Sequence, residues 1–126
     1  MGGVKDLEMR EVNKDLRART KQYSLRVIRM FTSLPNTSVA QVLGKQVLRS
    51  ATSVGAHYRE GHRARSNAEF ISKLEVALQE LDESAYWLEL LVEGEVFPAE
   101  KLADLIQETE ELIAIFVTCV KKAKEH

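Results

Sequence analysis

Polar side chains with a capacity for chemistry gather on two stretches of the sequence, and their spacing places them on two helix faces. The first face carries Arg49, Ser53, His57 and Glu60, and the second carries Glu69, Lys73, Glu80 and Glu83. Intervals of three, four and seven residues bring side chains to one side of an α-helix. If the two helices pair antiparallel, the His57 end of the first face meets the Lys73 end of the second. We expect a structural network of salt bridges and hydrogen bonds there, because partly buried charges must be paired.

The same residues offer an alternative, which is a metal site. His57-x-x-Glu60 and Glu80-x-x-Glu83 each put two possible ligands on one helix face. Di-iron bundles, however, need two Glu-x-x-His motifs and two further glutamates, and the sequence contains no Glu-x-x-His. We therefore predict no metal and no other cofactor, and a metal-dependent catalyst is kept only as a third hypothesis.

Nucleophilic catalysis finds little support in the sequence. The single cysteine, Cys119, lies among apolar residues of a predicted helix and has no histidine near it in the sequence, which is typical of an inert core or interface thiol. There is no Gly-rich phosphate loop and no Ser/His/Asp pattern. We predict a non-enzymatic protein. One cysteine forms no internal disulfide, so a reducing cytoplasm is the expected location.

The arginines are the third set of residues that could take part in binding. Residues 1–66 hold all nine arginines and carry 13 Lys or Arg against 5 Asp or Glu, whereas residues 67–126 carry 5 against 14. Because arginine suits bidentate phosphate contact, we predict contacts with RNA or DNA through Arg17, Arg19, Arg26, Arg29, Arg59, Arg63 and Arg65. The alternative is a protein–protein assembly module in which basic and acidic halves meet, within or between subunits, with no affinity for nucleic acid.

Four amphipathic segments must position these groups. Apolar residues recur with the helical period, and the sequence predicts helices over about 13–33, 38–61, 67–93 and 98–122 in one domain spanning 1–126. Short connections favour antiparallel neighbours, so we expect an all-α, up-down-up-down four-helix bundle. No apolar run approaches the roughly 20 residues that cross a bilayer.

Local signals mark the ends of these helices. Ser66 and Glu69 have the spacing of a capping box at the start of the third helix. Gly61 is predicted to end the second helix in a left-handed conformation, and Pro98 to be the first residue of the fourth. Gly44 and Gly55 have no side chain, so another helix could approach the second helix closely at these positions.

Several apolar residues fall outside the predicted core stripes. They are Leu25, Ile28, Leu48, Trp87, Leu91, Ile115 and Val117. A four-helix core does not have room for all of them, and apolar surface left outside a core implies an interface. The sequence therefore predicts that copies of the chain associate into a homo-oligomer.

The middle of the sequence also carries a recognisable pattern. It runs through Arg49–Ala56, Tyr58–Glu60, Arg63–Ser66, Glu69–Leu74, Glu80 and Tyr86–Leu91. This pattern resembles the small four-helix-bundle proteins of the 23S rRNA-intervening-sequence family. The family usually has asparagine where this chain has His57, so any role of the asparagine side-chain amide in the family is not expected in this chain.

The resemblance implies a bundle that assembles as a homopentamer, with no settled biochemical role. The family is similar in architecture to the accessory variability determinants of diversity-generating retroelements, which are basic pentamers that bind nucleic acid and a reverse transcriptase. By analogy this favours RNA or DNA, or a protein, as a partner besides the chain itself. No membrane partner is expected.

Overall fold

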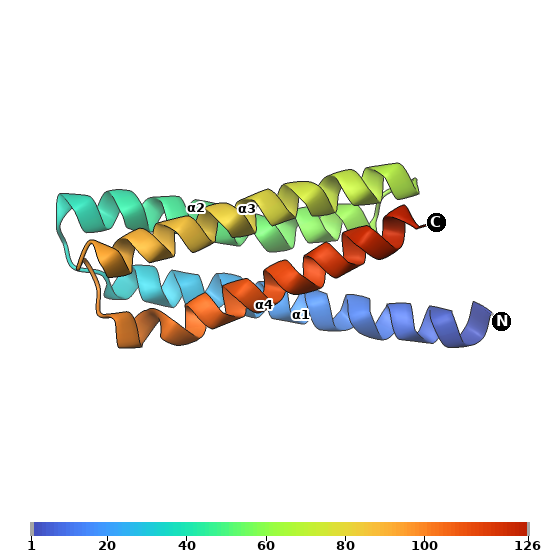
Figure 1. The fold of residues 1–126 in the computed structure, drawn as a ribbon, viewed down its shortest axis with the longest axis horizontal. Helices are drawn as coiled ribbons and strands as arrows, with labels where there is room; N and C mark the ends of the chain where they lie inside the picture. The colour runs from blue at the N-terminus through green and yellow to red at the C-terminus, as the bar shows by residue number, and fades with distance from the viewer. Residues whose placement is uncertain (1, 126) are drawn as a thin grey trace.

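A computed structural model describes the backbone of residues 2–125 and the side chains of residues 11–125. These residues form four α-helices and no strand (Figure 1), which confirms the all-α prediction: α1 Gly2–Ser33, α2 Ser38–His62, α3 Asn67–Glu93 and α4 Ala99–Lys124. The bounds of α3 agree with the sequence prediction, and α1 starts earlier than the predicted residue 13. The segment before residue 13 has no proline, and its glycines are confined to positions 2 and 3, so nothing from residue 4 onward stops helix propagation.

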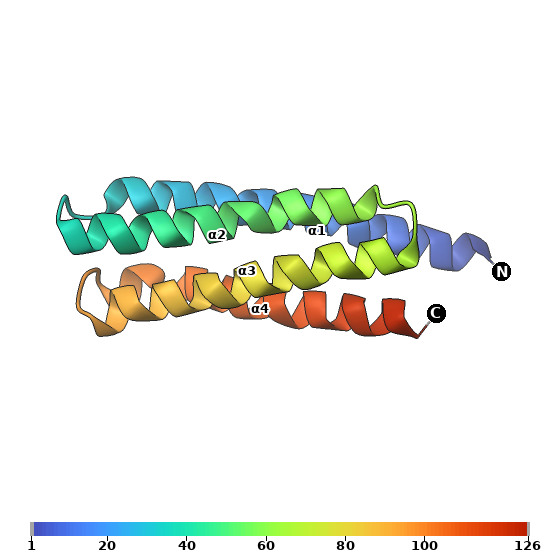
Figure 2. The same cartoon turned by 90° about the horizontal axis from the view of Figure 1, so that it is seen from above.

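Consecutive helices lie side by side, with their connections at alternating ends of the molecule (Figures 1 and 2). The α2–α3 connection lies at the same end as the start of α1 and the end of α4, and the other two connections lie at the opposite end. Backbone contact is most extensive between α2 and α3 and sparse between α1 and α4. The α1–α4 side is therefore held together mainly by side chains.

One contiguous hydrophobic cluster draws on all four helices. The apolar stripe predicted for α1 is buried, and its members are Leu16, Tyr23, Val27, Met30 and Leu34. Phe116 of α4 is fully buried and meets the Tyr58 ring edge-on, with 5.8 Å between ring centroids. The core residues follow the helical period that the sequence shows, so burial of that stripe is what places the helices.

The apolar residues outside the predicted stripes have mixed positions. Ile28 is 42% exposed and Val117 is 49% exposed. Leu25, Leu48, Trp87 and Ile115 are half-buried. Leu91, by contrast, is fully buried in the core, so its assignment to an outer surface was wrong. The end of α3 packs Leu88 and Leu91 inward together, which leaves less unburied apolar surface than the sequence suggested.

Gly61 does not have the predicted capping role. Helix α2 continues through it to His62, and no glycine among the described residues has a positive φ. A Cβ at Gly61 would lie 2.9 Å from Leu74 Cδ1 and 3.1 Å from Lys73 Cβ. Glycine is needed here because α2 and α3 approach closely. Gly55 has the same function toward α1, where a Cβ would lie 3.3 Å from Thr20 Oγ1.

The capping box at the start of α3 is present in a modified form. Ser66 Oγ accepts a hydrogen bond from the Glu69 amide at 3.1 Å, as the spacing predicts. The Glu69 carboxylate reaches back to the amide of Arg65 at 3.2 Å, rather than to that of Ser66. Pro98 lies one residue before α4, in an extended conformation with ψ 132°, so the prediction for that helix start was off by one position.

A layer of buried hydroxyl groups crosses the middle of the bundle, with one member from each helix: Tyr23, Ser50, Ser84 and Thr109. Tyr23 Oη lies 2.7 Å from Thr109 Oγ1, and Ser50 Oγ lies 2.8 Å from Ser84 Oγ. Thr109 and Ser84 each donate their only proton to a backbone carbonyl one turn earlier in their helix, at 2.8 Å. A hydroxyl has one proton, so Tyr23 must donate to Thr109 and Ser50 to Ser84. Burial raises the pKa of Tyr23.

Candidate functional site

The predicted polar faces of α2 and α3 lie beside the close contact between these two helices, which we call the α2–α3 seam. At one end of it Lys73 Nζ lies 2.9 Å from Glu60 Oε2. The hydrogen bond from Lys73 lowers the pKa of Glu60, and the same bond raises the pKa of Lys73. His57 Nδ1 lies 3.8 Å from Glu60 Oε2, which is too long for a hydrogen bond. The structure thus brings Glu60, Lys73 and His57 together.

The remaining members of the predicted network do not join this cluster. Ser53 donates to the carbonyl of Arg49, one turn earlier in the same helix, at 2.8 Å. Glu69 caps α3, and Arg49 and Glu83 are exposed, with no ion pair among the described residues. Helix periodicity predicts which residues share a face, but it does not determine which of them touch.

Three polar atoms of the seam are buried and have no hydrogen-bond partner among the described residues. They are His57 Nδ1, Glu80 Oε2 and Trp87 Nε1, and Trp87 shares the α3 face of Lys73 and Glu80 because the three are seven residues apart. Buried polar atoms in native proteins are nearly always hydrogen-bonded, to protein or to ordered water. The seam therefore has hydrogen-bonding capacity that residues 11–125 of one chain do not use.

Neither a metal cluster nor a reactive thiol is formed by the described residues. No group of three or more His, Cys, Asp or Glu side chains within them is close enough to hold a metal ion. Cys119 is half-buried, and burial raises the pKa of its thiol. A raised pKa suppresses the thiolate, which is the nucleophilic form.

The arginines predicted to bind nucleic acid do not form one surface. Arg19 reaches from α1 to α4, where its Nε lies 3.1 Å from Glu108 Oε2 and a second nitrogen binds the other oxygen of that carboxylate. A further nitrogen contact to Glu111 measures 3.3 Å. The hydrogen bonds to Glu108 raise the pKa of Arg19. Arg19 therefore forms an ion pair that joins the basic and acidic halves of the chain. Arg17, two residues before it, is half-buried.

Three other arginines lie at the end of the bundle that holds the α2–α3 connection. Arg59, Arg63 and Arg65 are exposed there, and no carboxylate of residues 11–125 lies within 4.0 Å of them. The end of α4 brings Lys121 and Lys122 to the same end (Figure 1). We call these five residues the basic end. Asn67 ties its two parts together by donating to the carbonyl of Ala123 at 2.8 Å.

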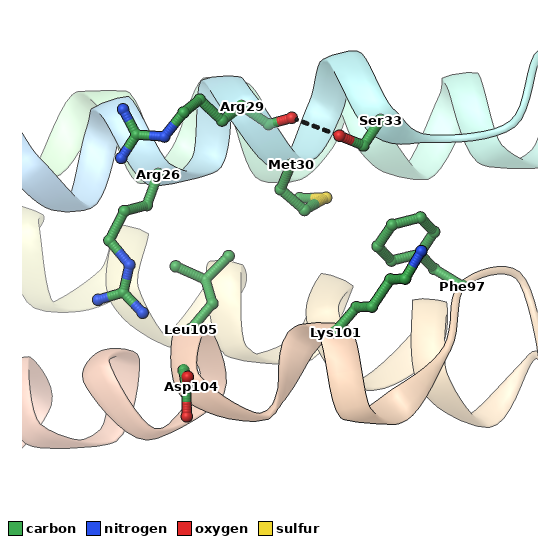
Figure 3. A pocket seen from close by; sticks show the side chains of 8 residues that line it. All are labelled: Arg26, Arg29, Met30, Ser33, Phe97, Lys101, Asp104 and Leu105. Carbon is green, nitrogen blue, oxygen red and sulfur yellow. Dashed lines mark hydrogen bonds between the residues drawn. The ribbon is translucent and has the colours of Figure 1, made fainter.

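Arg26 and Arg29 occupy a third location, in a groove between α1 and α4 (Figure 3). The groove has a volume of about 440 Å³, and Lys101 of α4 lines it from the other side. Sequence reasoning missed Lys101 because the lysine lies more than 70 positions from these arginines. Only the spatial relation of α1 to α4 brings the three cations together.

The fold and these surfaces define a small all-α protein with a partly unsatisfied polar seam and separate basic clusters. Residues 13–118 match the family model described as 23S rRNA-intervening sequence protein, and the chain belongs to that family. A crystal structure from Bacteroides thetaiotaomicron VPI-5482, described as a protein of unknown function from the S23 ribosomal protein family, is 33% identical. The match covers 86% of this chain and 97% of that chain, with a TM-score of 0.81. A search of curated proteins found no match.

Family membership confirms the resemblance drawn from the central motif and indicates no catalytic family. None of the helices in residues 2–125 combines the length and the apolar character that a bilayer crossing requires.

Proposed function

We propose that this protein is a non-enzymatic, cytoplasmic, up-down-up-down bundle that contacts the phosphate backbone of RNA or DNA through its basic end. The observation that supports this proposal is the set of exposed arginines at the α2–α3 connection, which have no carboxylate partner within residues 11–125. Guanidinium groups in that state can bind phosphate oxygens without first breaking an ion pair.

The basic end also has a structural explanation. Arg59 lies in the last turn of α2, and Lys121 and Lys122 lie in the last turn of α4. Cations at helix C-termini complement the partial negative charge of the helix dipole. Arg63 and Arg65 lie beyond the α2 helix, at its C-cap and in the connection. Because these two arginines lie outside the helical turns, they are the ones whose substitution tests phosphate binding with the least effect on the helix dipole.

The test is a titration of single-stranded RNA across salt concentration, with the Arg63→Ala/Arg65→Ala variant. We expect binding at low salt that weakens steeply as salt rises, because bound cations release counterions from the RNA. Loss of two phosphate contacts lowers the slope of log K against log salt by about 1.4. The affinity of the variant at low salt is expected to fall about tenfold or more.

The matched control is Lys45→Ala/Arg49→Ala, which removes the same charge from exposed positions of α2 outside the basic end. At about 0.1 M salt, where the Debye length is about 10 Å, the control is expected to keep its affinity within about twofold, since long-range attraction is largely screened. Equal losses in both variants, or no binding by the unmodified protein at low salt, would contradict the proposal.

We also propose that copies of the chain assemble, with a pentamer as the expected form. The supporting observation is the exposure of two large apolar side chains, since Ile28 is 42% exposed and Val117 is 49% exposed. Apolar surface that a bundle leaves exposed is removed from water when copies of the chain associate.

Sedimentation velocity at about 50 mM and about 500 mM salt tests the assembly, since screening differs strongly between these concentrations. We expect an oligomer at both concentrations. An oligomer that loosens at high salt, from a protein that fails to bind RNA, would instead support the protein–protein module in which charge asymmetry joins subunits. A monomer at both concentrations would contradict assembly.

A further inference from the structure

The groove between α1 and α4 combines cations from both helices with an apolar floor. Figure 3 shows Arg26 reaching from α1 toward α4, Arg29 above it on α1, and Lys101 on the α4 side. Met30 and Leu105, which are 8% and 5% exposed, close the bottom together with the half-buried Phe97. Lys101 Nζ lies 5.7 Å from the centroid of the Phe97 ring.

The groove exists because α1 and α4 do not pack closely along their backbones. Figure 1 shows α4 inclined to α1, and the two helices share few close backbone positions. The Arg19–Glu108 and Tyr23–Thr109 contacts join them at mid-length. Toward the α3–α4 connection the space between them is left open, and its volume of about 440 Å³ falls in the range of small-molecule sites.

The cationic side chains of the groove lining are not paired with carboxylates of residues 11–125. No carboxylate of residues 11–125 lies within 4.0 Å of a charged nitrogen of Arg26, Arg29 or Lys101. Arg26 and Arg29 are three positions apart on one helix, a spacing at which like charges are destabilising. Asp104 is the one acidic residue of the groove lining, which leaves a net charge of +2. A bound dianion would relieve this repulsion.

We propose that this groove binds a small organic phosphate monoester with an apolar or aromatic body. The phosphate suits the site because a monoester carries a charge of about −2 at neutral pH and three acceptor oxygens, which complement the net positive charge of the lining and the guanidinium that Arg26 extends toward α4. The apolar body lies over Met30, Phe97 and Leu105. A phosphodiester carries a single charge per phosphate, so the site favours the monoester over the nucleic-acid backbone.

The test is a two-dimensional NMR titration of the full chain with three probes: phenyl phosphate, inorganic phosphate and phenol. Phenyl phosphate presents both halves of the proposed ligand, and each of the other probes presents one half. We expect phenyl phosphate to bind about tenfold or more tightly than either, with amide shifts confined to the groove-lining parts of α1 and α4. Inorganic phosphate that binds as tightly as phenyl phosphate would overturn the claim of an amphipathic ligand.

The variant Arg26→Gln/Lys101→Gln removes one cation from each side of the groove. Hydrogen bonds between charged partners contribute about 1.5–3 kcal/mol each, so phenyl phosphate affinity is expected to fall at least about tenfold. Lys45→Gln/Arg49→Gln is the control of equal charge on α2, and it is expected to keep its affinity. Circular dichroism verifies that both variants are folded, and a folded groove variant with unchanged affinity would overturn the proposal.

The groove and the basic end can be tested separately. Arg29 lies one turn from the end of α1, and Arg59 lies in the last turn of α2 at the other end of the bundle (Figure 1). The Arg63→Ala/Arg65→Ala variant is expected to bind phenyl phosphate as the unmodified chain does. A loss of phenyl phosphate binding in that variant would place the anion at the basic end and overturn the groove assignment.

Discussion

Replacement of Phe116 by alanine is expected to lower the free energy of unfolding by about 3–5 kcal/mol. The ring is fully buried, packs edge-on against Tyr58 of α2, and belongs to the cluster that joins all four helices. Truncation removes the transfer free energy of the ring and leaves a cavity that rigid helices fill only partly. Because α4 has little backbone contact with α1, few other contacts compensate. Urea unfolding followed by circular dichroism measures the change.

Val117→Ala is the matched control for this measurement. Val117 is the next residue of the same helix and is 49% exposed, so its truncation is expected to change the unfolding free energy by at most about 0.5 kcal/mol. A Phe116→Ala cost below about 1 kcal/mol, or a Val117→Ala cost of similar size, would show that α4 is not packed as described.

Removal of the Thr109 hydroxyl is expected to destabilise the fold by about 1–3 kcal/mol, although valine matches threonine in shape. Thr109 is the acceptor for the Tyr23 proton, and without it a buried O–H has lost its partner. Tyr23→Phe removes that donor instead and is expected to cost about 0.5–1.5 kcal/mol. In the double variant neither group is left unpaired, so its cost is expected to be smaller than the sum of the two single costs.

Thr118→Val provides the control for the threonine substitution. Thr118 lies on the same helix and donates to the carbonyl of Ala114 four residues earlier, at 3.0 Å, as Thr109 does to that of Leu105. It is exposed, so its replacement is expected to have an effect within about 0.5 kcal/mol. Strictly additive costs for Tyr23→Phe and Thr109→Val would contradict the hydrogen bond between these two hydroxyl groups.

The helices were predictable as elements because apolar residues recur with the helical period in each, whereas their ends were predicted less well, since α1 starts before residue 13 and α2 continues through Gly61. Ser66 and Glu69 fixed the start of α3 to the residue. The role of Gly61 was predicted wrongly because a glycine near a helix end can either adopt a left-handed cap conformation or allow another helix to approach closely. Only the short distance to Leu74 shows that Gly61 serves close approach. Local sequence carries backbone preference but not the separation between helices.

The candidate sites were predictable only as lists of residue types. Helical spacing identified Glu60 and Lys73 as facing residues, but it gave no indication that Glu80 and His57 would hold buried atoms without partners. It also grouped Arg19 with Arg63, whereas the structure pairs Arg19 with Glu108. Which charges are neutralised depends on which helices are neighbours and at what register. The groove beside Arg26 depends in addition on the inclination of α4 to α1.

The position of Trp87 gives the molecule an intrinsic optical reporter. It is the only tryptophan of the chain, and its indole lies half-buried in the α2–α3 seam with its ring centroid 5.1 Å from that of Tyr86. Figure 2 shows α2 and α3 in front of α1 and α4, so the seam and the groove lie on opposite sides. Indole fluorescence is therefore expected to change if another subunit covers the seam and to stay constant if a ligand fills the groove, so one emission spectrum would distinguish the two proposed events without any added label.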